Sequence, residues 1–259
     1  MLLGLVRPTS GHARVLGQSI EKPASYLSRV GAMIEGPAFY PRLSGRKNLQ
    51  FLQRLSGLPV KGDAIANSLE HVGLSGRGDE RYRGYSLGMK QRLGIAAALM
   101  SDPELLILDE PTNGLDPDGA REIRELIMEL AARGLTIFIS SHLLEELELM
   151  CDYFVMIKSG TIAFAGSYRT LVSSQVQTLV VETEYEIDLP ALMRVAGDRG
   201  ISATVVGSSL HLRHELHPMS VSGADFNRWA SEAGITLSRL HIKVPSLAEI
   251  FFNTREESQ

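Results

Sequence analysis

Two adjacent carboxylates follow a short apolar run in the segment 105–117, which reads LLILDEPTNGLDP. The run predicts a buried strand that ends at Asp109, with Glu110 directly after it. The pair suits phosphoryl hydrolysis: Asp109 would hold Mg²⁺ through water and Glu110 would polarise the attacking water, while the metal neutralises charge on the phosphate oxygens. An ordinary strand followed by an acidic turn is the alternative that this segment alone leaves open.

A second candidate anion site lies in the segment 85–92, YSLGMKQR, at the start of a predicted helix. A hydroxyl group and backbone N–H groups at a helix N-terminus, together with the positive end of the helix dipole, attract an anion. Ser86 and Gly88 supply these groups, although a serine before a helix also serves as a plain N-cap. His142 follows an apolar strand and could contact a phosphate or cap the next helix.

Four segments of the chain resemble motifs of ATP-binding cassette (ABC) ATPases, in the order that the family has them. The segment 85–92 resembles the ABC signature, 105–110 the Walker B segment, 114–117 the D-loop and 140–142 the switch-histidine segment. The resemblance covers at least residues 1–166. It implies that the chain binds ATP and Mg²⁺.

The resemblance also implies roles for individual residues. Glu110 would be the catalytic carboxylate, His142 would contact the γ-phosphate, and Asp109 would lie at the Mg²⁺. The residues that the family places at the nucleotide of an opposite subunit correspond here to Ser86, Leu87, Gly88, Met89, Gln91 and Asp116. Leu87 and Met89 depart from the commoner Ser-Gly-Gly-Gln form of the signature, a variation that drug-exporter subgroups tolerate.

Glu35 follows a predicted strand at a position where the family normally has glutamine, a residue that binds Mg²⁺ and senses the membrane subunit. A carboxylate is also a suitable Mg²⁺ ligand, so we expect Glu35 at the metal. Glutamate in this loop, with the segments 39–41 and 45–49, resembles the subgroup that exports bacitracin and lantibiotics.

The elements that position these residues follow from the spacing of apolar side chains. The expected strands are 13–16, 30–34, 105–108, 136–140, 153–157 and 161–164, and the expected helices are 45–52, 63–72, 90–100, 118–132 and 143–150. The pattern of residues 1–6 predicts the last turns of a helix. Continuous apolar strands joined by helices favour a mostly parallel sheet covered on both faces, with ligands at the carboxyl ends of the strands.

The fold class expected from the resemblance is α/β: a P-loop NTPase-like ABC cassette with a mostly parallel sheet and an inserted helical subdomain. The cassette is expected over residues 1–170, with the helical subdomain at about 44–100. Short alternating strands and helices predict a small α+β accessory domain over 177–259. Within it, His211, His214 and His217 do not share one face of a strand, whose side chains repeat every second residue, so a metal site there is not expected.

Composition excludes several classes of protein. The 259 residues carry a formal net charge of −4 with both signs mixed, which argues against a nucleic-acid partner. No apolar run approaches the roughly 20 residues of a membrane-spanning helix, and no signal peptide is evident. Cys151 is the one cysteine, so an intrachain disulfide is impossible and a small core residue is expected.

The sequence contains no Gly-x-x-x-x-Gly-Lys-Ser/Thr phosphate loop, which cassette ATPases carry. Residues 2–11 resemble the pattern that follows this loop in the family. We therefore expect a start placed at an internal methionine, with a truncated gene or a degenerate subunit as the alternatives. The 259-residue chain by itself is expected to be poorly soluble and to hydrolyse no ATP.

The expected function is that of the nucleotide-binding subunit of an ABC transporter, which binds and hydrolyses ATP to power export. Its partners would be a separate transmembrane permease, contacted near residues 35–49, and a second nucleotide-binding subunit that completes two ATP sites. The expected location is the cytoplasm, at the inner face of the cell membrane. The alternatives are a non-catalytic or truncated subunit that lends its signature to a competent partner, and a soluble, non-transport ABC ATPase.

Overall fold

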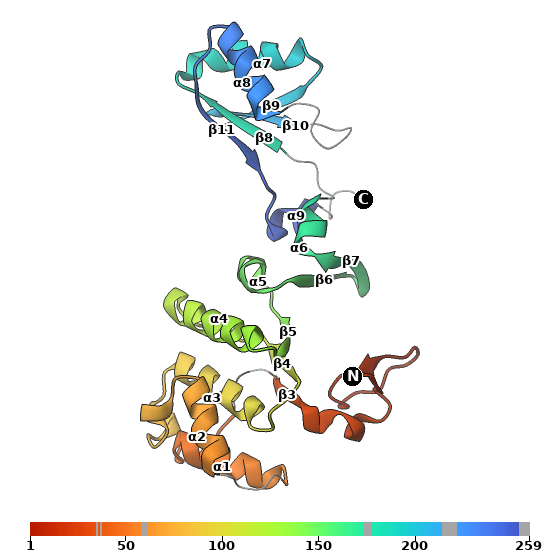
Figure 1. The fold of residues 1–259 in the computed structure, drawn as a ribbon, viewed down its shortest axis with the longest axis vertical. Helices are drawn as coiled ribbons and strands as arrows, with labels where there is room; N and C mark the ends of the chain where they lie inside the picture. The colour runs from red at the N-terminus through yellow and green to blue at the C-terminus, as the bar shows by residue number, and fades with distance from the viewer. Residues whose placement is uncertain (35, 37, 58–61, 174–177, 214–221, 254–259) are drawn as a thin grey trace. The chain divides into compact units, whose positions relative to one another are not determined.

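The structure is a computed structural model that describes residues 1–259 except 35, 37, 58–61, 174–177, 214–221 and 254–259 (Figure 1). It divides into two compact units, Met1–Glu146 and Leu147–Gln259. The expected extent of the cassette, to residue 170, stays a prediction.

A three-stranded parallel sheet lies at the centre of the first unit. Its order is β3 (Val30–Met33), β4 (Leu105–Asp109) and β5 (Thr136–Ser140). Leu106 and Leu108 on β4 are fully buried, because the strand has a neighbour on both sides. The three strands confirm the predicted parallel sheet and bring the carboxyl ends of β4 and β5 to one edge.

Two helices pack against this sheet. Helix α3 (Leu87–Leu99) contacts β3, and α4 (Pro117–Ala132) contacts both β5 and α3. The apolar positions of α4 repeat at helical spacing and are all buried, as Ile123, Leu126, Ile127 and Leu130. The helix begins with proline at its first position, where the missing N–H is not needed.

The inserted helical region contains α1 (Gly45–Leu55), α2 (Gly62–His71) and the start of α3, with the 3₁₀ turns η3 (Ser75–Arg77) and η4 (Tyr82–Gly84). Helix α1 packs against α2 and α3, and α2 packs against α3. Leu49, Ile65, Leu69 and Leu93 are buried almost completely. This region confirms the predicted helices and leads directly into the segment 85–92.

The prediction of a helix at the start of the chain is wrong. Residues 2–6 form turns and bends, and Gly4 has a left-handed φ of +72° that a continuous helix does not allow. The apolar side chains of Leu2 and Leu3 pack on a small cluster that includes Tyr26. The hairpin β1 (Arg14–Val15) and β2 (Gln18–Ser19) follows, and then the turns η1 (Pro23–Ser25) and η2 (Leu27–Arg29).

The second unit contains the antiparallel pair β6 (Tyr153–Lys158) and β7 (Thr161–Ser167), and an antiparallel sheet of order β11-β8-β10-β9. The strands of that sheet are β8 (Thr178–Thr183), β9 (Ser202–Val206), β10 (Ser209–Arg213) and β11 (Leu237–Lys243). With the turn η5 (Glu186–Asp188), α7 (Leu189–Gly197) and α8 (Gly223–Glu232), they form a split β-α-β arrangement. These elements have the α+β character expected for this part of the chain, and a separate domain over 177–259 stays a prediction.

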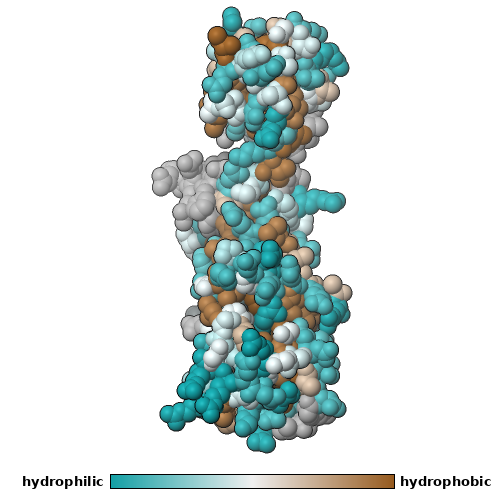
Figure 2. Space-filling model, turned by 90° about the vertical axis from the view of Figure 1, so that its left-hand side faces the viewer, coloured by the Kyte–Doolittle hydropathy of each residue, from teal (hydrophilic) through white to brown (hydrophobic). Residues whose placement is uncertain are grey.

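The core of this α+β domain lies between the sheet and its two helices. Leu192, Leu210 and Phe226 are fully buried there, from α7, β10 and α8. The described residues also form the helices α5 (Leu144–Met150), α6 (Tyr168–Ser173) and α9 (Leu247–Asn253). Hydrophobic and hydrophilic side chains both reach the surface that Figure 2 shows. Among the described helices, none combines the length and the apolar character that crossing a membrane requires.

Candidate active site

The carboxyl end of β4 places Asp109 and Glu110 at the edge of the parallel sheet. The hydroxyl of Ser140, at the end of the neighbouring β5, donates a hydrogen bond to Oδ1 of Asp109. The backbone N–H of Glu110 donates to the Ser140 carbonyl at 2.9 Å. Glu110 itself has a left-handed φ of +49°, a conformation that costs about 1–3 kcal/mol in a non-glycine residue and that clusters at functional sites.

His142 meets Glu110 at two points. Its backbone N–H donates to Oε1 of Glu110 at 3.0 Å, and its ring Nδ1 lies 2.9 Å from both carboxylate oxygens. The Glu110 side chain is 30% exposed and the His142 side chain 62%, so solvent or a ligand can reach the pair. The structure therefore places Glu110 in contact with His142, directly after Asp109, and the roles of these three residues at a nucleotide stay predictions.

An ionised carboxylate can only accept hydrogen bonds, which fixes the direction of the ring contact. Nδ1 of His142 must carry the hydrogen when it bonds to Glu110. The other ring nitrogen, Nε2, is then left for a further partner. The arrangement holds the carboxylate of Glu110 in one orientation from both the backbone and the side chain of the same histidine.

The segment 85–92 begins helix α3, with Ser86 as its N-cap. The Ser86 Oγ accepts a hydrogen bond from the backbone N–H of Met89 at 3.2 Å. A hydroxyl still has a proton to donate after accepting this bond, so Ser86 can serve both as a cap and as a donor to an anion. Leu87 is exposed, Gly88 and Met89 are partly buried, and Gln91 is 5% exposed with no hydrogen-bond partner at Oε1.

Tyr85 anchors the segment just before Ser86. Its ring is 4% exposed, and its hydroxyl donates to the Arg77 carbonyl at 2.7 Å. Burial raises the pKa of the Tyr85 phenol, so the hydroxyl stays protonated and keeps this hydrogen bond at neutral pH.

The D-loop residues lie beside the start of α3. Asp116 caps α4, because its Oδ1 accepts from the Gly119 N–H at 3.2 Å. A Cβ built on Gly114 would lie 3.3 Å from Leu87 Cδ2, and one on Gly88 would lie 3.9 Å from Leu115 Cδ2. The predicted signature and D-loop residues are thus neighbours. None of the hydrogen bonds found among the described residues joins them to Glu110 or His142.

Among the described residues, one carboxylate is placed where it could bind Mg²⁺. No group of three or more His, Cys, Asp and Glu residues gathers in the described part of the chain. Mg²⁺ commonly binds through one or two carboxylates and the substrate phosphates, and Asp109, oriented by Ser140, offers one such carboxylate. Glu35 lies outside the described residues, as do His214 and His217, so what was expected of them stays a prediction.

Sequence reasoning missed several polar side chains that support the site. Ser140 was noted as part of a motif but not as the partner of Asp109, although its place at the end of the adjacent predicted strand could have indicated it. Away from the acids, Asn48 forms hydrogen bonds with Tyr40, eight residues earlier, and Arg92 forms them with Val72 and Glu122. Thr112, 2% exposed with no partner at Oγ1, is a further buried polar residue next to the acids.

Comparisons with known proteins point to the same family as the motifs do. The family model described as "ABC transporter" matches residues 1–113. The chain is 36% identical over 261 residues to a bacitracin transport ATP-binding protein, BcrA, of Enterococcus faecalis, covering 97% of this chain and 80% of that protein. It is 49% identical over 164 residues to the protein of the same name from Bacillus licheniformis, covering 62% of this chain and 53% of that protein.

A solved structure shows the same fold. It is cbiO1 of Clostridium perfringens, described as part of the ABC transporter complex cbiONQ, with a TM-score of 0.59 and 27% identity over 67% of this chain and 72% of that one. The chain spans about half the length of several curated relatives that it matches. From the Enterococcus relative, which aligns with nearly the whole chain, it follows that the chain belongs to the family of ABC transporter ATP-binding proteins.

Proposed function

We propose that the chain is the nucleotide-binding subunit of an ABC transporter, which binds and hydrolyses ATP to drive export through a separate membrane subunit. The observation that carries the proposal is the contact between Glu110, at the end of β4, and His142, after β5. The names of the relatives from Enterococcus and Bacillus support a transporter for bacitracin or a similar antibiotic peptide.

In the proposed reaction, the oxygen of a water molecule bonds to the γ-phosphorus of ATP while the bond to the β–γ bridging oxygen breaks, so that ADP leaves and the water's proton is lost with the phosphate product. Glu110 accepts a hydrogen bond from this water and orients it, while His142 holds the carboxylate of Glu110 in place. The Nε2 of His142 then faces a second partner, for which the γ-phosphate is suited in charge when the ring is protonated. Positioning of this kind, together with electrostatic stabilisation, supplies most of the rate enhancement in enzymatic phosphoryl transfer.

Mg²⁺ would be held at Asp109, with Glu35 as a second proposed ligand. When bound, the metal neutralises charge on the β- and γ-phosphate oxygens. The part of Ser140 is to orient the Asp109 carboxylate through its hydroxyl.

The signature residues would complete the nucleotide site of a second subunit. The hydroxyl of Ser86, the backbone at Gly88 and the N-terminus of α3 present donors to an anion, and the adjoining Asp116 lies at the same surface. The proposal therefore includes a dimer of nucleotide-binding subunits. With a membrane subunit as partner, the complex would work at the inner face of the cell membrane.

The test is to co-express the chain with the membrane subunit and any second nucleotide-binding subunit encoded beside it, and to measure ATP turnover and export from vesicles. The complex should hydrolyse ATP with Mg²⁺ and transport an antibiotic peptide, whereas the chain alone should be inactive. A complex that forms but neither hydrolyses ATP nor transports would contradict the proposal. Turnover that survives Glu110→Gln and is lost on changing the partner's carboxylate would instead support a subunit that only lends its signature.

A further inference from the structure

Arg92 joins two parts of the first unit that lie on either side of α3. Its Nη1 donates to the Val72 carbonyl at 2.8 Å, just after the end of α2. Its Nη2 donates to Oε2 of Glu122, on α4, at 3.0 Å. The Arg92 side chain is 20% exposed and that of Glu122 is 58% exposed, so the guanidinium is the more buried partner. The planar guanidinium of Arg92 thus binds the backbone after α2 and a side chain of α4 at the same time, as a bridge between them.

The local backbone is shaped for this contact. Gly73 has a left-handed φ of +69°, and a Cβ at this position would lie 3.1 Å from Nη1 of Arg92. Any other residue at position 73 would therefore be strained and would crowd the guanidinium. The turn after α2 and the arginine of α3 fit each other.

The ion pair between Arg92 and Glu122 lies equally far from the N-termini of α3 and α4, and the N-cap residues of both helices belong to the proposed site. Arg92 follows the N-cap Ser86 by six residues, and Glu122 follows the N-cap Asp116 by six. At about 1.5 Å of rise per residue, both anchor points lie roughly 9 Å from the helix starts. A Cβ built on Gly114 would lie 3.3 Å from Leu87, and one built on Gly88 would lie 3.9 Å from Leu115, so the start of α3 and the loop before α4 lie close together. Movement of Arg92 would therefore reach the D-loop.

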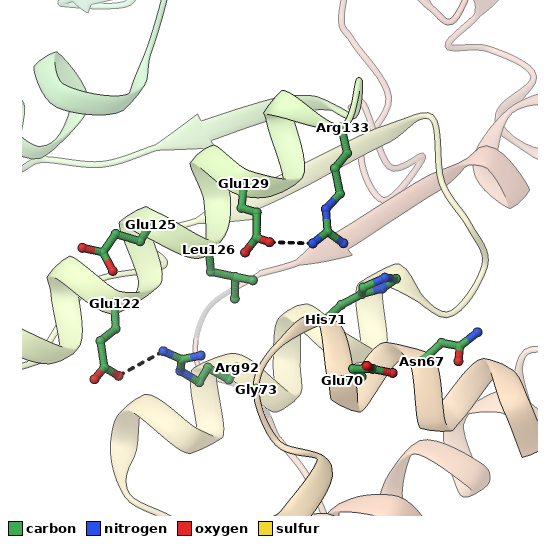
Figure 3. A pocket seen from close by; sticks show the side chains of 10 residues that line it. All are labelled: Asn67, Glu70, His71, Gly73, Arg92, Glu122, Glu125, Leu126, Glu129 and Arg133. Atoms are coloured by element: carbon green, nitrogen blue, oxygen red, sulfur yellow. Dashed lines mark hydrogen bonds and ion pairs between the residues drawn. The ribbon is translucent and has the colours of Figure 1, made fainter.

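Next to the bridge, α2 and α4 face each other across a hollow of about 570 Å³. Figure 3 shows Glu70 and His71 on the α2 side and Glu125 and Glu129 on the α4 side. Leu126 is the one large apolar side chain among the ten described residues that line it. A polar hollow admits water, so a change of spacing between α2 and α4 across it separates few packed apolar side chains, although both helices also pack against α3.

We propose that Arg92 is a positioning residue that links the helical region α1–α2, and through it the membrane subunit, to the D-loop residues Gly114–Asp116. When the membrane subunit moves the helical region, the Val72 carbonyl moves with α2, and Arg92 passes the shift to Glu122 and α4. The inference rests on the proposed function. It adds a residue that acts on the coupling of ATP turnover to the membrane subunit, without touching the nucleotide.

The test measures ATP turnover by a complex of this chain with the second nucleotide-binding subunit, in the presence and in the absence of the membrane subunit. Arg92→Ala removes both arms of the bridge, and Glu122→Ala removes only the arm to α4. Arg92→Lys keeps the charge but lacks the fork that reaches both partners. The matched control is Arg121→Ala, also an arginine ion-paired to a carboxylate, which joins Asp118 at 3.0 Å within α4 alone.

We expect Arg92→Ala and Glu122→Ala to keep the turnover measured without the membrane subunit and the KM for ATP. The stimulation by the membrane subunit should fall roughly 2- to 30-fold. Arg92→Lys should lose less of it, and Arg121→Ala should match the wild type. Glu122→Ala leaves the hydrogen bond between Arg92 and the Val72 carbonyl in place. It therefore tests the coupling even if Arg92→Ala lowers the stability of the first unit.

Two results would overturn the inference while the wild-type complex remains active. One is full stimulation in both Arg92→Ala and Glu122→Ala. The other is a proportional fall of turnover with and without the membrane subunit in Glu122→Ala, which indicates a structural role only. A wild-type complex with no ATP turnover contradicts the proposed function first, and the inference with it.

Discussion

Replacing Asn48 by leucine should destabilise the first unit and free the loop before α1. Asn48 is 1% exposed, and its side chain forms three hydrogen bonds. Nδ2 donates to the carbonyls of Tyr40 at 3.2 Å and Ser44 at 3.0 Å, and Oδ1 accepts from the Tyr40 N–H at 2.8 Å. At a net value of about 1 kcal/mol for each hydrogen bond, Asn48→Leu should lower the free energy of unfolding by about 3 kcal/mol.

Gln53 offers a matched control on the same helix. It is 2% exposed, close to the value for Asn48, but its Oε1 has no hydrogen-bond partner. Replacing an unsatisfied buried acceptor by a carbon group of similar size removes a penalty rather than a bond. Gln53→Leu should therefore change the free energy of unfolding by less than about 1 kcal/mol, or increase it.

Urea denaturation followed with two probes separates the units. The single tryptophan, Trp229, lies on α8 in the second unit, so its fluorescence reports that unit, whereas far-UV circular dichroism reports both. With m near 1–3 kcal/mol/M, a loss of about 3 kcal/mol lowers the urea midpoint of the first unit by about 1 M or more. Equal effects of Asn48→Leu and Gln53→Leu on the circular dichroism transition would refute the reasoning.

Two further predictions concern titratable groups of the second unit. Burial is the main cause, and the charge of Asp152 the second, that raises the pKa of the Cys151 thiol. A thiol reagent should therefore react slowly at pH 7 and faster only above about pH 9. Rapid labelling at pH 7 would contradict this prediction. Hydrogen bonds from Ser222 lower the pKa of Asp225, so this carboxylate contributes stability above its ordinary pKa of 3.8 that is lost as the pH falls through the lowered value. Acid titration of Trp229 fluorescence should show that loss in the wild type and less of it in Asp225→Asn; identical curves would refute it.

The parts of the fold that sequence reasoning recovered have strong local patterns. The run Leu105–Leu108 has an apolar residue at every position, as a strand with neighbours on both sides requires, and α4 has apolar residues at helical spacing. The acids were expected at the end of one strand and the histidine after another, and the parallel pairing of β4 and β5 brings these carboxyl ends to one edge, where Glu110 and His142 meet.

The features that sequence reasoning did not recover depend on contacts between residues far apart in the sequence, which a local pattern does not show. At the start of the chain, apolar residues 2–6 resemble a helix, but Gly4 adopts a left-handed turn and Leu2 and Leu3 pack on a distant cluster. The bridge of Arg92 joins residues 20 and 30 positions away in the sequence. The left-handed φ of Glu110 also has no sequence signature, since glutamate rarely adopts it.

The most direct test of the account is the ATP turnover of the assembled complex carrying Glu110→Gln. Glutamine keeps the size of the side chain and an oxygen that can accept from His142, but it lacks the charge that polarises water. The control is Glu129→Gln, which changes a surface carboxylate of α4 that is ion-paired to Arg133. The account predicts bound ATP with turnover reduced roughly 100- to 10,000-fold in Glu110→Gln and normal turnover in the control. Wild-type turnover in Glu110→Gln would contradict it.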